Sequence, residues 1–234
     1  MKTKIGLTSN VLKLFAVICM IVQHIAILFI PSDGIVKTLM IMAGAFTAPI
    51  MCFFVAEGYY RTSNLKKYAL RLLIGAVISH VPHALAFGHG VWDVFHATSV
   101  MWPLFLGLVS LAVWENKNIH LLLRCAILMV CAVLSYPGNF NCIAILWILS
   151  FGVFRGDKVK QSLAFFASCV LHYAQSFVIT PGNPAWYRFI PLLVLPMVFL
   201  YNGQRGRKSN LIKYGYYIIY PLHLIILYLL NQII

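Results

Sequence analysis

The sequence predicts an all-α membrane protein, a polytopic bundle of about nine transmembrane helices. Three observations lead to this fold class. Hydrophobic residues make up 62% of the 234 residues and charged residues only 10%, which excludes an ordinary soluble domain. Long apolar runs recur from one end of the chain to the other, and most Lys and Arg residues fall in alternate gaps between them.

The apolar runs set the expected helices in chain order. About 20 apolar residues cross a bilayer as a helix, and lipid offers no partner for the exposed backbone of any other structure. The alternating ten-residue strands of a membrane β-barrel are not visible. Two of the runs, 140–154 and 186–201, are short for a complete span. The expected helices occupy residues 11–30, 35–60, 68–87, 96–114, 119–135, 140–154, 161–179, 186–201 and 211–232.

The first run is interpreted as a retained helix. Lys2 and Lys4 precede it, as in a signal peptide, but the run is long, contains Lys13, Gln23 and His24, and has no small-residue cleavage site. Soluble linkers, low-complexity tracts and internal repeats are not visible along the chain. The sequence therefore predicts a single polytopic domain over residues 1–234.

The basic residues predict the orientation. All but Lys37 and Arg188 of the 18 Lys and Arg residues lie near the N-terminus or in the second, fourth, sixth and eighth gaps. Short basic loops stay in the cytoplasm, so we expect a multi-pass protein of the cytoplasmic (inner) membrane with a cytoplasmic N-terminus. The orientation of the chain in the lipid bilayer then explains the +13 net charge, and no nucleic-acid partner is expected. The loops expected inside surround Lys66, Lys158 and Arg207, and those expected outside are 88–90 and 181–183.

Ionisable residues inside the runs are candidate functional residues, because each costs several kcal/mol unless it is paired or hydrated. His24, Glu57, His172 and His223 stand out. Glu57 and Arg61 are spaced i, i+4 and share one helix face. They form either an ion pair that ends the helix or a cavity site where the carboxylate orients a catalytic group or binds an amine.

His24 is the leading candidate base, because an imidazole can take a proton from an attacking amine or hydroxyl. The structural alternative is a hydrogen-bonded packing residue. A second histidine within a run, His223, favours a polar cavity shared by the two.

The sequence predicts no metal site. His80 and His83 have i, i+3 spacing, which is compatible with a metal, but only Asp93 is a nearby carboxylate. We expect an interfacial polar surface there. The six cysteines are scattered through apolar runs without a C-x-x-C pair and are expected to be small buried hydrophobes.

Two basic clusters, 61–71 and 202–209, have two interpretations. Topology alone demands positive charge in such loops. The alternative is binding of a phosphorylated cytosolic cofactor by arginine forks and exposed backbone amides.

Several motifs carry a family resemblance. They are PIMCFFVAEGYYRTSN at 49–64, KYALRL at 67–72, YNG at 201–203 and YIIYPLHL at 217–224. Together they resemble the TraX family, and the resemblance extends over residues 9–230. The type activity of that family is N-terminal acetylation of F-type conjugative pilin at the inner membrane. One departure is Gln23, at a position where family members usually carry Asp. The motifs also suggest kinship with broader transmembrane acyltransferases, an analogy that fixes no substrate.

The resemblance implies an integral membrane acetyltransferase that moves acetyl from acetyl-CoA to an amine or hydroxyl, such as the N-terminus of a pilin subunit. His24 is the expected base, Tyr220 or backbone amides the oxyanion donors, and His223 and Glu57 the cavity lining. The residues expected to hold the CoA phosphates are Arg61, Lys67, Arg71, Arg205 and Arg207. A small-molecule or ion transporter and a non-catalytic conjugation or secretion assembly protein remain alternatives.

Overall fold

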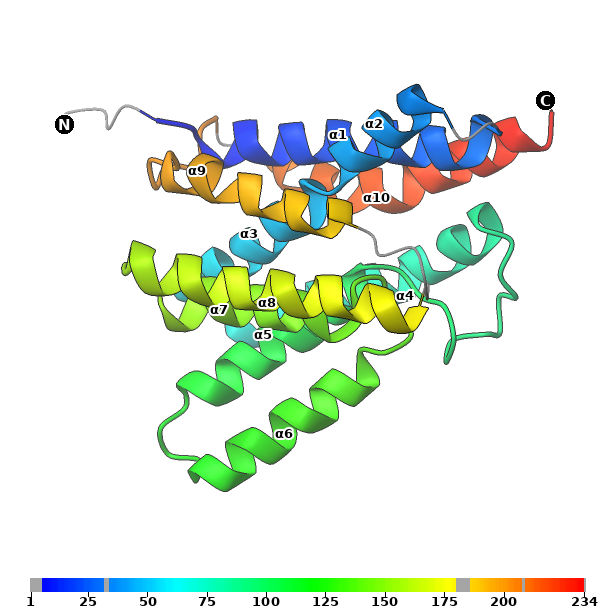
Figure 1. Cartoon of the computed structure of the whole chain (residues 1–234). Coiled ribbons are helices and arrows are strands. Elements are labelled where there is room, and N and C mark those ends of the chain that lie inside the picture. Colours follow the sequence, from blue (N-terminus) through cyan, green and yellow to red (C-terminus); the bar gives the residue numbers. More distant parts are fainter. Residues whose placement is uncertain (1–5, 32–33, 180–185, 208, 234) are drawn as a thin grey trace.

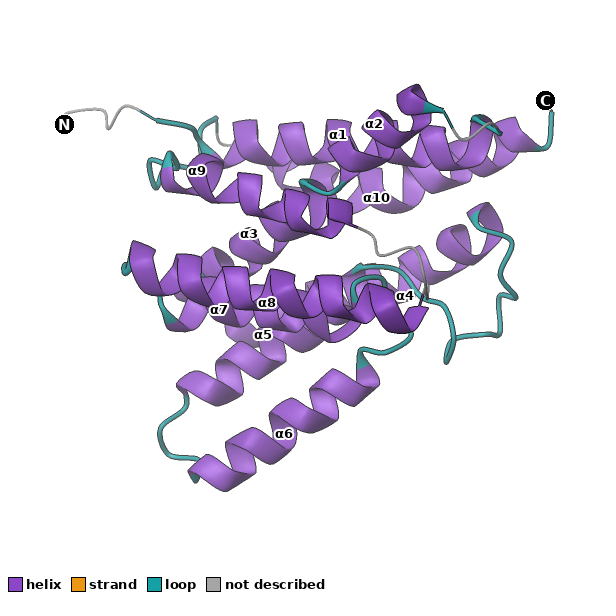
Figure 2. Ribbon diagram, viewed as in Figure 1, coloured by secondary structure: helices purple, strands orange, loops and turns teal. Residues whose placement is uncertain are grey.

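The protein is all-helical over the part of the chain that the structure describes, which confirms the predicted fold class (Figures 1 and 2). The structure is a computed structural model that describes every residue except 1–5, 32–33, 180–185, 208 and 234. Lys2, Lys4 and the predicted outer loop 181–183 therefore lie outside the described residues. In chain order the elements are α1 (Ser9–Phe29), α2 (Ile35–Gly44), α3 (Thr47–Arg61), α4 (Leu65–Ala86), α5 (Met101–Glu115), α6 (Leu121–Leu134), α7 (Asn141–Val153), α8 (Lys158–Ile179), the 3-10 helix η1 (Trp186–Leu193), α9 (Val194–Phe199) and α10 (Asn210–Asn231).

Each predicted apolar run corresponds to helical structure, but only some runs are long enough to cross a bilayer. Among the described residues, four segments have the required length and apolar composition: Ser9–Phe29, Ile35–Arg61, Leu65–Ala86 and Tyr214–Asn231. The shorter apolar helices are Met101–Glu115, Leu121–Leu134, Asn141–Val153 and Trp186–Phe199.

Two runs are less regular than predicted. The run 35–60 is broken between α2 and α3 by a turn at Ala45 and Phe46. Pro49 lies in the first turn of α3, where its missing N–H costs nothing. The run 186–201 forms η1 and the short α9 rather than one α-helix. Pro191 and Pro196 lie in these two elements, and each removes a backbone donor that a continuous helix would use.

The core of the bundle lies where α3, α5 and α7 pack together. Small residues allow close approach of α5 and α7: a Cβ on Gly107 would lie 2.3 Å from Ile148, and one on Gly152 would lie 2.5 Å from Leu111. Trp147 of α7 is fully buried beside them. Helix α6 packs on α5 and α7 at the outside of the bundle (Figure 1), with apolar side chains such as Leu122 exposed as expected for a lipid-facing surface.

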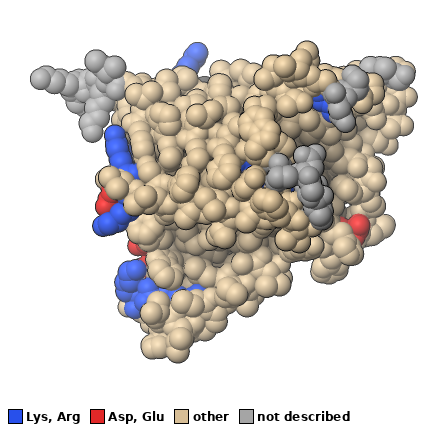
Figure 3. Space-filling view, viewed as in Figure 1, with Lys and Arg blue, Asp and Glu red and all other residues tan. Residues whose placement is uncertain are grey.

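The segment before α1 and the connections after α3 and α9 lie together at one end of the bundle, here called the basic end. The backbone N–H of Leu7 donates to the Leu200 carbonyl at 2.8 Å, and that of Ser9 to Gln204 at 2.9 Å. Arg61 donates to the Gly203 carbonyl at 2.8 Å. Lys and Arg gather at this end of the visible face (Figure 3).

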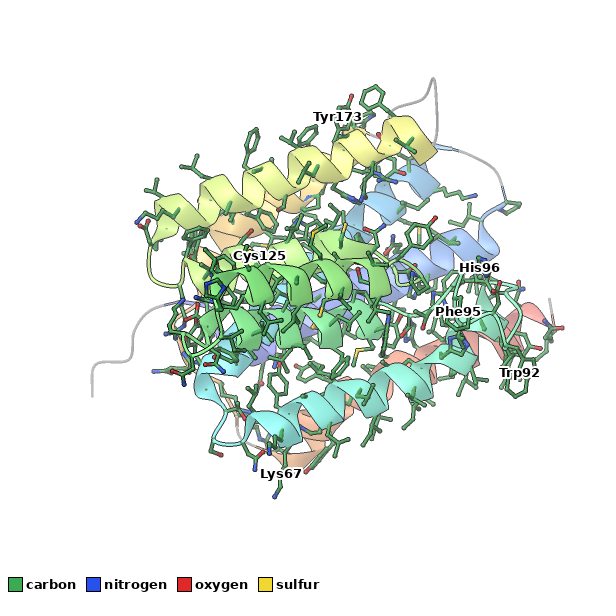
Figure 4. The ribbon with its side chains drawn as sticks, turned by 90° about the horizontal axis from the view of Figure 1, so that it is seen from below. Lys67, Trp92, Phe95, His96, Cys125 and Tyr173 are labelled. Atoms are coloured by element: carbon green, nitrogen blue, oxygen red, sulfur yellow. The ribbon has the colours of Figure 1, made fainter. Side chains whose placement is uncertain are left out.

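The opposite end, here called the histidine end, is formed by the α4–α5 and α6–α7 connections. The backbone N–H of Thr98 donates to the Pro137 carbonyl at 2.7 Å and joins the two. Figure 4 shows Lys67 at the start of α4 and, at the other end, the loop after α4 with the exposed side chains of Trp92, Phe95 and His96. The predicted inner loops at Lys66 and Arg207 thus lie at the basic end and the predicted outer loop 88–90 at the other.

Candidate functional site

A large cavity runs through the bundle from the basic end to the histidine end. Its volume is about 1030 Å³, and its lining includes Lys13 and His24 of α1. These two residues are eleven positions apart, which corresponds to roughly 16 Å along an α-helix. The other lining residues come mainly from α3, α4, α5, α10 and the 136–141 connection. The cavity therefore connects two chemically different ends of the molecule.

Most of the predicted cofactor-binding residues surround the cavity mouth at the basic end. Arg61, Lys67, Arg71 and Arg205 line this mouth together with Thr62, Ser63 and Asn64. Arg61, Arg71 and Arg205 also line the large cavity, so the large cavity itself extends to the basic residues of the mouth. The Nε atom of Arg71 is buried and has no hydrogen-bond partner in the described structure.

Arg207 is not among the residues that line the mouth or the cavity. Its carbonyl accepts a hydrogen bond of 2.9 Å from the Asn10 side chain. Arg207 thus contributes to the junction between the N-terminal segment and the α9–α10 connection.

Glu57 lines the cavity at the basic end and is paired with two arginines. Its Oε2 lies 2.7 Å from Arg61 Nε, and its Oε1 lies 2.8 Å from Arg155 Nε. The Glu57 carboxylate raises the pKa of Arg155, so Arg155 stays charged. Arg61 also reaches the Gly203 carbonyl, near the level of Ser9 and far from His24 on α1. Glu57 therefore stabilises the mouth and is not positioned to orient His24.

His24 and His223 form a buried pair, although 199 positions separate them. His24 Nδ1 lies 2.8 Å from His223 Nε2, and the ring centroids lie 5.0 Å apart in nearly parallel planes. His24 lines the cavity, and His223 lies behind it. The His223 Nδ1 donates to the Ile219 carbonyl of its own helix at 2.9 Å.

This arrangement fixes the tautomers of the neutral pair. A carbonyl can only accept, so Nδ1 of His223 carries the hydrogen and its Nε2 is an acceptor. His24 must then donate from Nδ1, and its Nε2 keeps a lone pair available to a ligand in the cavity. A proton taken by His24 Nε2 can be shared with His223 through the same hydrogen bond. The pair has the properties of a general base that is oriented without a carboxylate.

Gln23 and Tyr220 flank the pair but do not hold it. Gln23 packs against α2, where a Cβ on Gly44 would lie 2.1 Å from its Oε1. Tyr220 lines the cavity, its ring contacts the His223 ring at 5.5 Å, and its hydroxyl lies beside Ser99 and Val100. The hydrogen-bond partner of His24 in the described structure is thus His223 and not Gln23.

Several cavity residues were not assigned a role from the sequence. Lys13 lies over the Phe54 ring at 4.8 Å and adds a cation to the basic end of the cavity. The sequence marks Arg155 only as one of the basic residues between apolar runs, although its guanidinium pairs with the Glu57 carboxylate. His83 and His172 also line the cavity. A cation or histidine inside an apolar run is the only sequence signal for Lys13 and His172, and no such signal marks Arg155.

The donor set suits an anion at the basic end better than a metal at either end. In the described part of the chain, no group of three or more His, Cys, Asp or Glu side chains is arranged to hold a metal ion. His80 and His83 bind different partners: His80 contacts Thr98 and Val91, whereas His83 contacts Asn139.

These features define an α-helical membrane protein with a cavity that extends from a basic mouth to His24 of a histidine pair. The chain belongs to the TraX family, because the family model described as TraX protein matches residues 8–231. It is also similar to the probable fimbrial assembly protein FimC, serogroup H1, of Dichelobacter nodosus, with 22% identity over 238 residues and 97% of each protein covered. No solved structure matches the chain.

Proposed function

We propose that the protein is a membrane acetyltransferase that takes acetyl from acetyl-CoA and transfers it to an acceptor inside the bundle. The observation that carries the proposal is the continuity of the cavity between the basic mouth and His24. One end offers cations for phosphates, and the other offers a buried base. An acyl donor of extended shape, with phosphates at one end and a thioester at the other, matches this polarity.

The mouth would bind the nucleotide phosphates. Arg71 and Arg205 have no carboxylate partner in the described structure, whereas Arg61 is held by Glu57 and Gly203. The unpartnered Nε of Arg71 is a donor that a phosphate oxygen would satisfy. The distance of roughly 16 Å between the levels of Lys13 and His24 suits an extended pantetheine arm.

His24 would act as the general base. Its Nε2 would take the proton from the attacking hydroxyl or amine while the nucleophile attacks the thioester carbonyl carbon. The C–S bond then breaks, and the thiolate of CoA takes the proton back from His24. His223 would hold the reactive tautomer and share the positive charge during the step.

The proposal includes a location and an orientation. Acetyl-CoA is a cytosolic molecule, so the basic end would face the cytoplasm, in agreement with the rule that short basic loops stay inside. The N-terminus would then be cytoplasmic, in the inner membrane. The type activity of the family and the name of the Dichelobacter relative both favour a role connected with pili, with a pilin subunit as a candidate acceptor.

Labelled acetyl-CoA tests the donor half of the proposal. We expect purified protein in detergent to bind acetyl-CoA and to release CoA. Arg71→Ala and Arg205→Ala should each weaken binding about tenfold, because each loses a charge-assisted contact. Lys66→Ala is the matched control, since Lys66 lies on α4 near Arg71 but does not line the mouth. Equal acetyl-CoA binding by the wild type and the three variants would mean that the basic loops determine only the membrane topology.

A non-catalytic assembly factor is the second candidate, supported by the fimbrial assembly name of the relative. It predicts that pilus formation depends on the protein but not on His24. A His24 variant that restores pili in a deletion strain without binding or consuming acetyl-CoA would favour this candidate.

A further inference from the structure

The histidine end of the cavity is enclosed by the connection between α6 and α7. Asn139 contacts His83 of α4 at 3.1 Å, and Asn141 accepts from Gln175 of α8 at 3.3 Å. Phe140 packs its ring against that of His172 at 5.8 Å. All six residues line the cavity, so this connection joins two helices into a defined wall.

The backbone of this wall is strained. Phe140 has φ of 66° and Asn141 has φ of 35°, the left-handed region that a bulky side chain rarely adopts. These are the only non-glycine residues with positive φ among those described. Such strain persists when the surroundings enforce it, and it concentrates at ligand sites.

Two buried imidazoles in the wall have an unsatisfied nitrogen. Nδ1 of His83 and Nδ1 of His172 have no hydrogen-bond partner in the described structure, and both side chains are more than nine-tenths buried. The Asn139 amide donates to His83 Nε2, so the hydrogen of the neutral His83 ring is on Nδ1. His83 is therefore an unused donor, and buried groups of this kind normally have a partner.

The chemistry of the wall favours an uncharged ligand rich in oxygen. Its polar groups include imidazoles, amides and Arg188, and the Phe87 ring contacts the His24 and His83 rings, with centroids 5.3 and 4.9 Å away. The only carboxylate among the described lining residues is Glu57, which is paired with arginines at the other end. A hydroxyl can both donate and accept, whereas an ammonium finds no counter-charge here.

We infer that the histidine end is the acceptor site and that it binds a neutral, hydroxyl-rich head group of the sugar or polyol class. The inference rests on the proposed function for the identity of this ligand as an acceptor, and it replaces the amine of a pilin N-terminus by a hydroxyl. The rings of His83 and His24 both contact the Phe87 ring, so a hydroxyl hydrogen-bonded by His83 would lie near His24. In the transfer, the hydroxyl proton goes to His24, the new C–O bond forms an acetyl ester, and the C–S bond breaks to give CoA.

Binding of small probes tests the site without acetyl-CoA. Saturation-transfer difference NMR would compare methyl β-D-glucoside with n-propylamine, using protein in a detergent without a sugar head group. We expect saturation of the glucoside and little of the amine. His83→Gln and His172→Phe should weaken glucoside binding about tenfold, the effect of losing a hydrogen bond to a buried group. His80→Gln is the control, because both ring nitrogens of His80 already have protein partners.

The outcomes separate this inference from the proposed function. Glucoside binding without acetyl-CoA binding would support the hydroxyl site and refute the proposed acetyltransferase activity. Acetyl-CoA binding with no glucoside signal, or with stronger saturation of the amine, would overturn the hydroxyl site and leave the donor half intact. Equal glucoside binding by wild type and by folded His83→Gln and His172→Phe proteins would also overturn it. Size-exclusion profiles and acetyl-CoA affinity show whether each variant is folded.

Discussion

Replacing Glu57 by Gln should lower stability and strengthen acetyl-CoA binding, two effects of opposite sign. Glutamine keeps the shape of the side chain but removes the negative charge that Arg61 and Arg155 share. Both arginines remain near the mouth, because Arg61 also binds the Gly203 carbonyl and Arg155 lies over the Tyr60 ring at 4.9 Å. Their charges would then be available to an anionic ligand.

The size of both effects follows from the geometry. The Glu57 side chain is 11% exposed, but those of its partners are 46% and 43% exposed, so solvent screens the pairs considerably. Hydrogen bonds to charged groups contribute about 1.5–3 kcal/mol, and with screening we expect a net loss of about 1–2 kcal/mol. For an assumed separation of about 8 Å between the position of the Glu57 carboxylate and a bound phosphate, removing the negative charge gains about 0.5–2 kcal/mol over effective dielectric constants from 80 to 20, or about 2- to 30-fold in affinity.

Thermal unfolding in detergent and calorimetric titration with acetyl-CoA measure the two effects on the same preparation. Lys66→Ala serves as a reference for a charge change outside the mouth. A folded Glu57→Gln protein with unchanged or weaker acetyl-CoA binding would refute the placement of the phosphates at this mouth.

Three further predictions concern packing, orientation and the histidine pair. Gly44→Ala should destabilise the protein by about 1–3 kcal/mol, measured by thermal unfolding. The new Cβ at position 44 would clash with the Gln23 side chain, including the Gln23 Cβ, so a change of the Gln23 rotamer could not relieve the overlap. Single cysteines would be introduced at positions 89 and 158 of a cysteine-free protein and treated in intact cells with a membrane-impermeant reagent. Only the cysteine at position 89 should react, and reaction at position 158 alone would show the opposite orientation. His223→Leu should lower turnover by roughly 10- to 100-fold, as loss of an orienting partner does for metal-bound histidines, and His223→Gln by less, since its amide oxygen can still accept from His24. Equal turnover of the two variants would contradict the orienting role.

The helices were predictable from the sequence because lipid imposes a simple rule on length and composition. Every predicted apolar run contains helical structure, and the short length of the run 140–154 could be read directly from the sequence. The break at Ala45 was not predicted, although Gly44 before it and Pro49 after it are residues typical of helix boundaries. The division of 186–201 into η1 and α9 could have been suspected from Pro191 and Pro196.

The site was predictable in its parts but not in its pairings. His24 and His223 were chosen because histidine is costly in a span, yet their contact depends on how α1 and α10 are rotated against each other. Glu57 was assigned an i, i+4 partner from helix geometry, whereas Arg155, its second partner, is 98 positions away. Pairings over such separations depend on the packing of whole helices, which a single sequence does not encode in a local pattern.

The central claim is that His24 is the base in an acetyl-CoA-dependent reaction. His24→Asn tests it most directly, because the asparagine amide can still donate to His223 Nε2 while the reactive Nε2 is lost. The measurement is the rate of CoA release from saturating acetyl-CoA by purified wild type and variant, with acetyl-CoA affinity as the check on folding. The account predicts unchanged affinity and a rate lower by roughly 10²–10⁴-fold. A folded His24→Asn protein that releases CoA at the wild-type rate would contradict it.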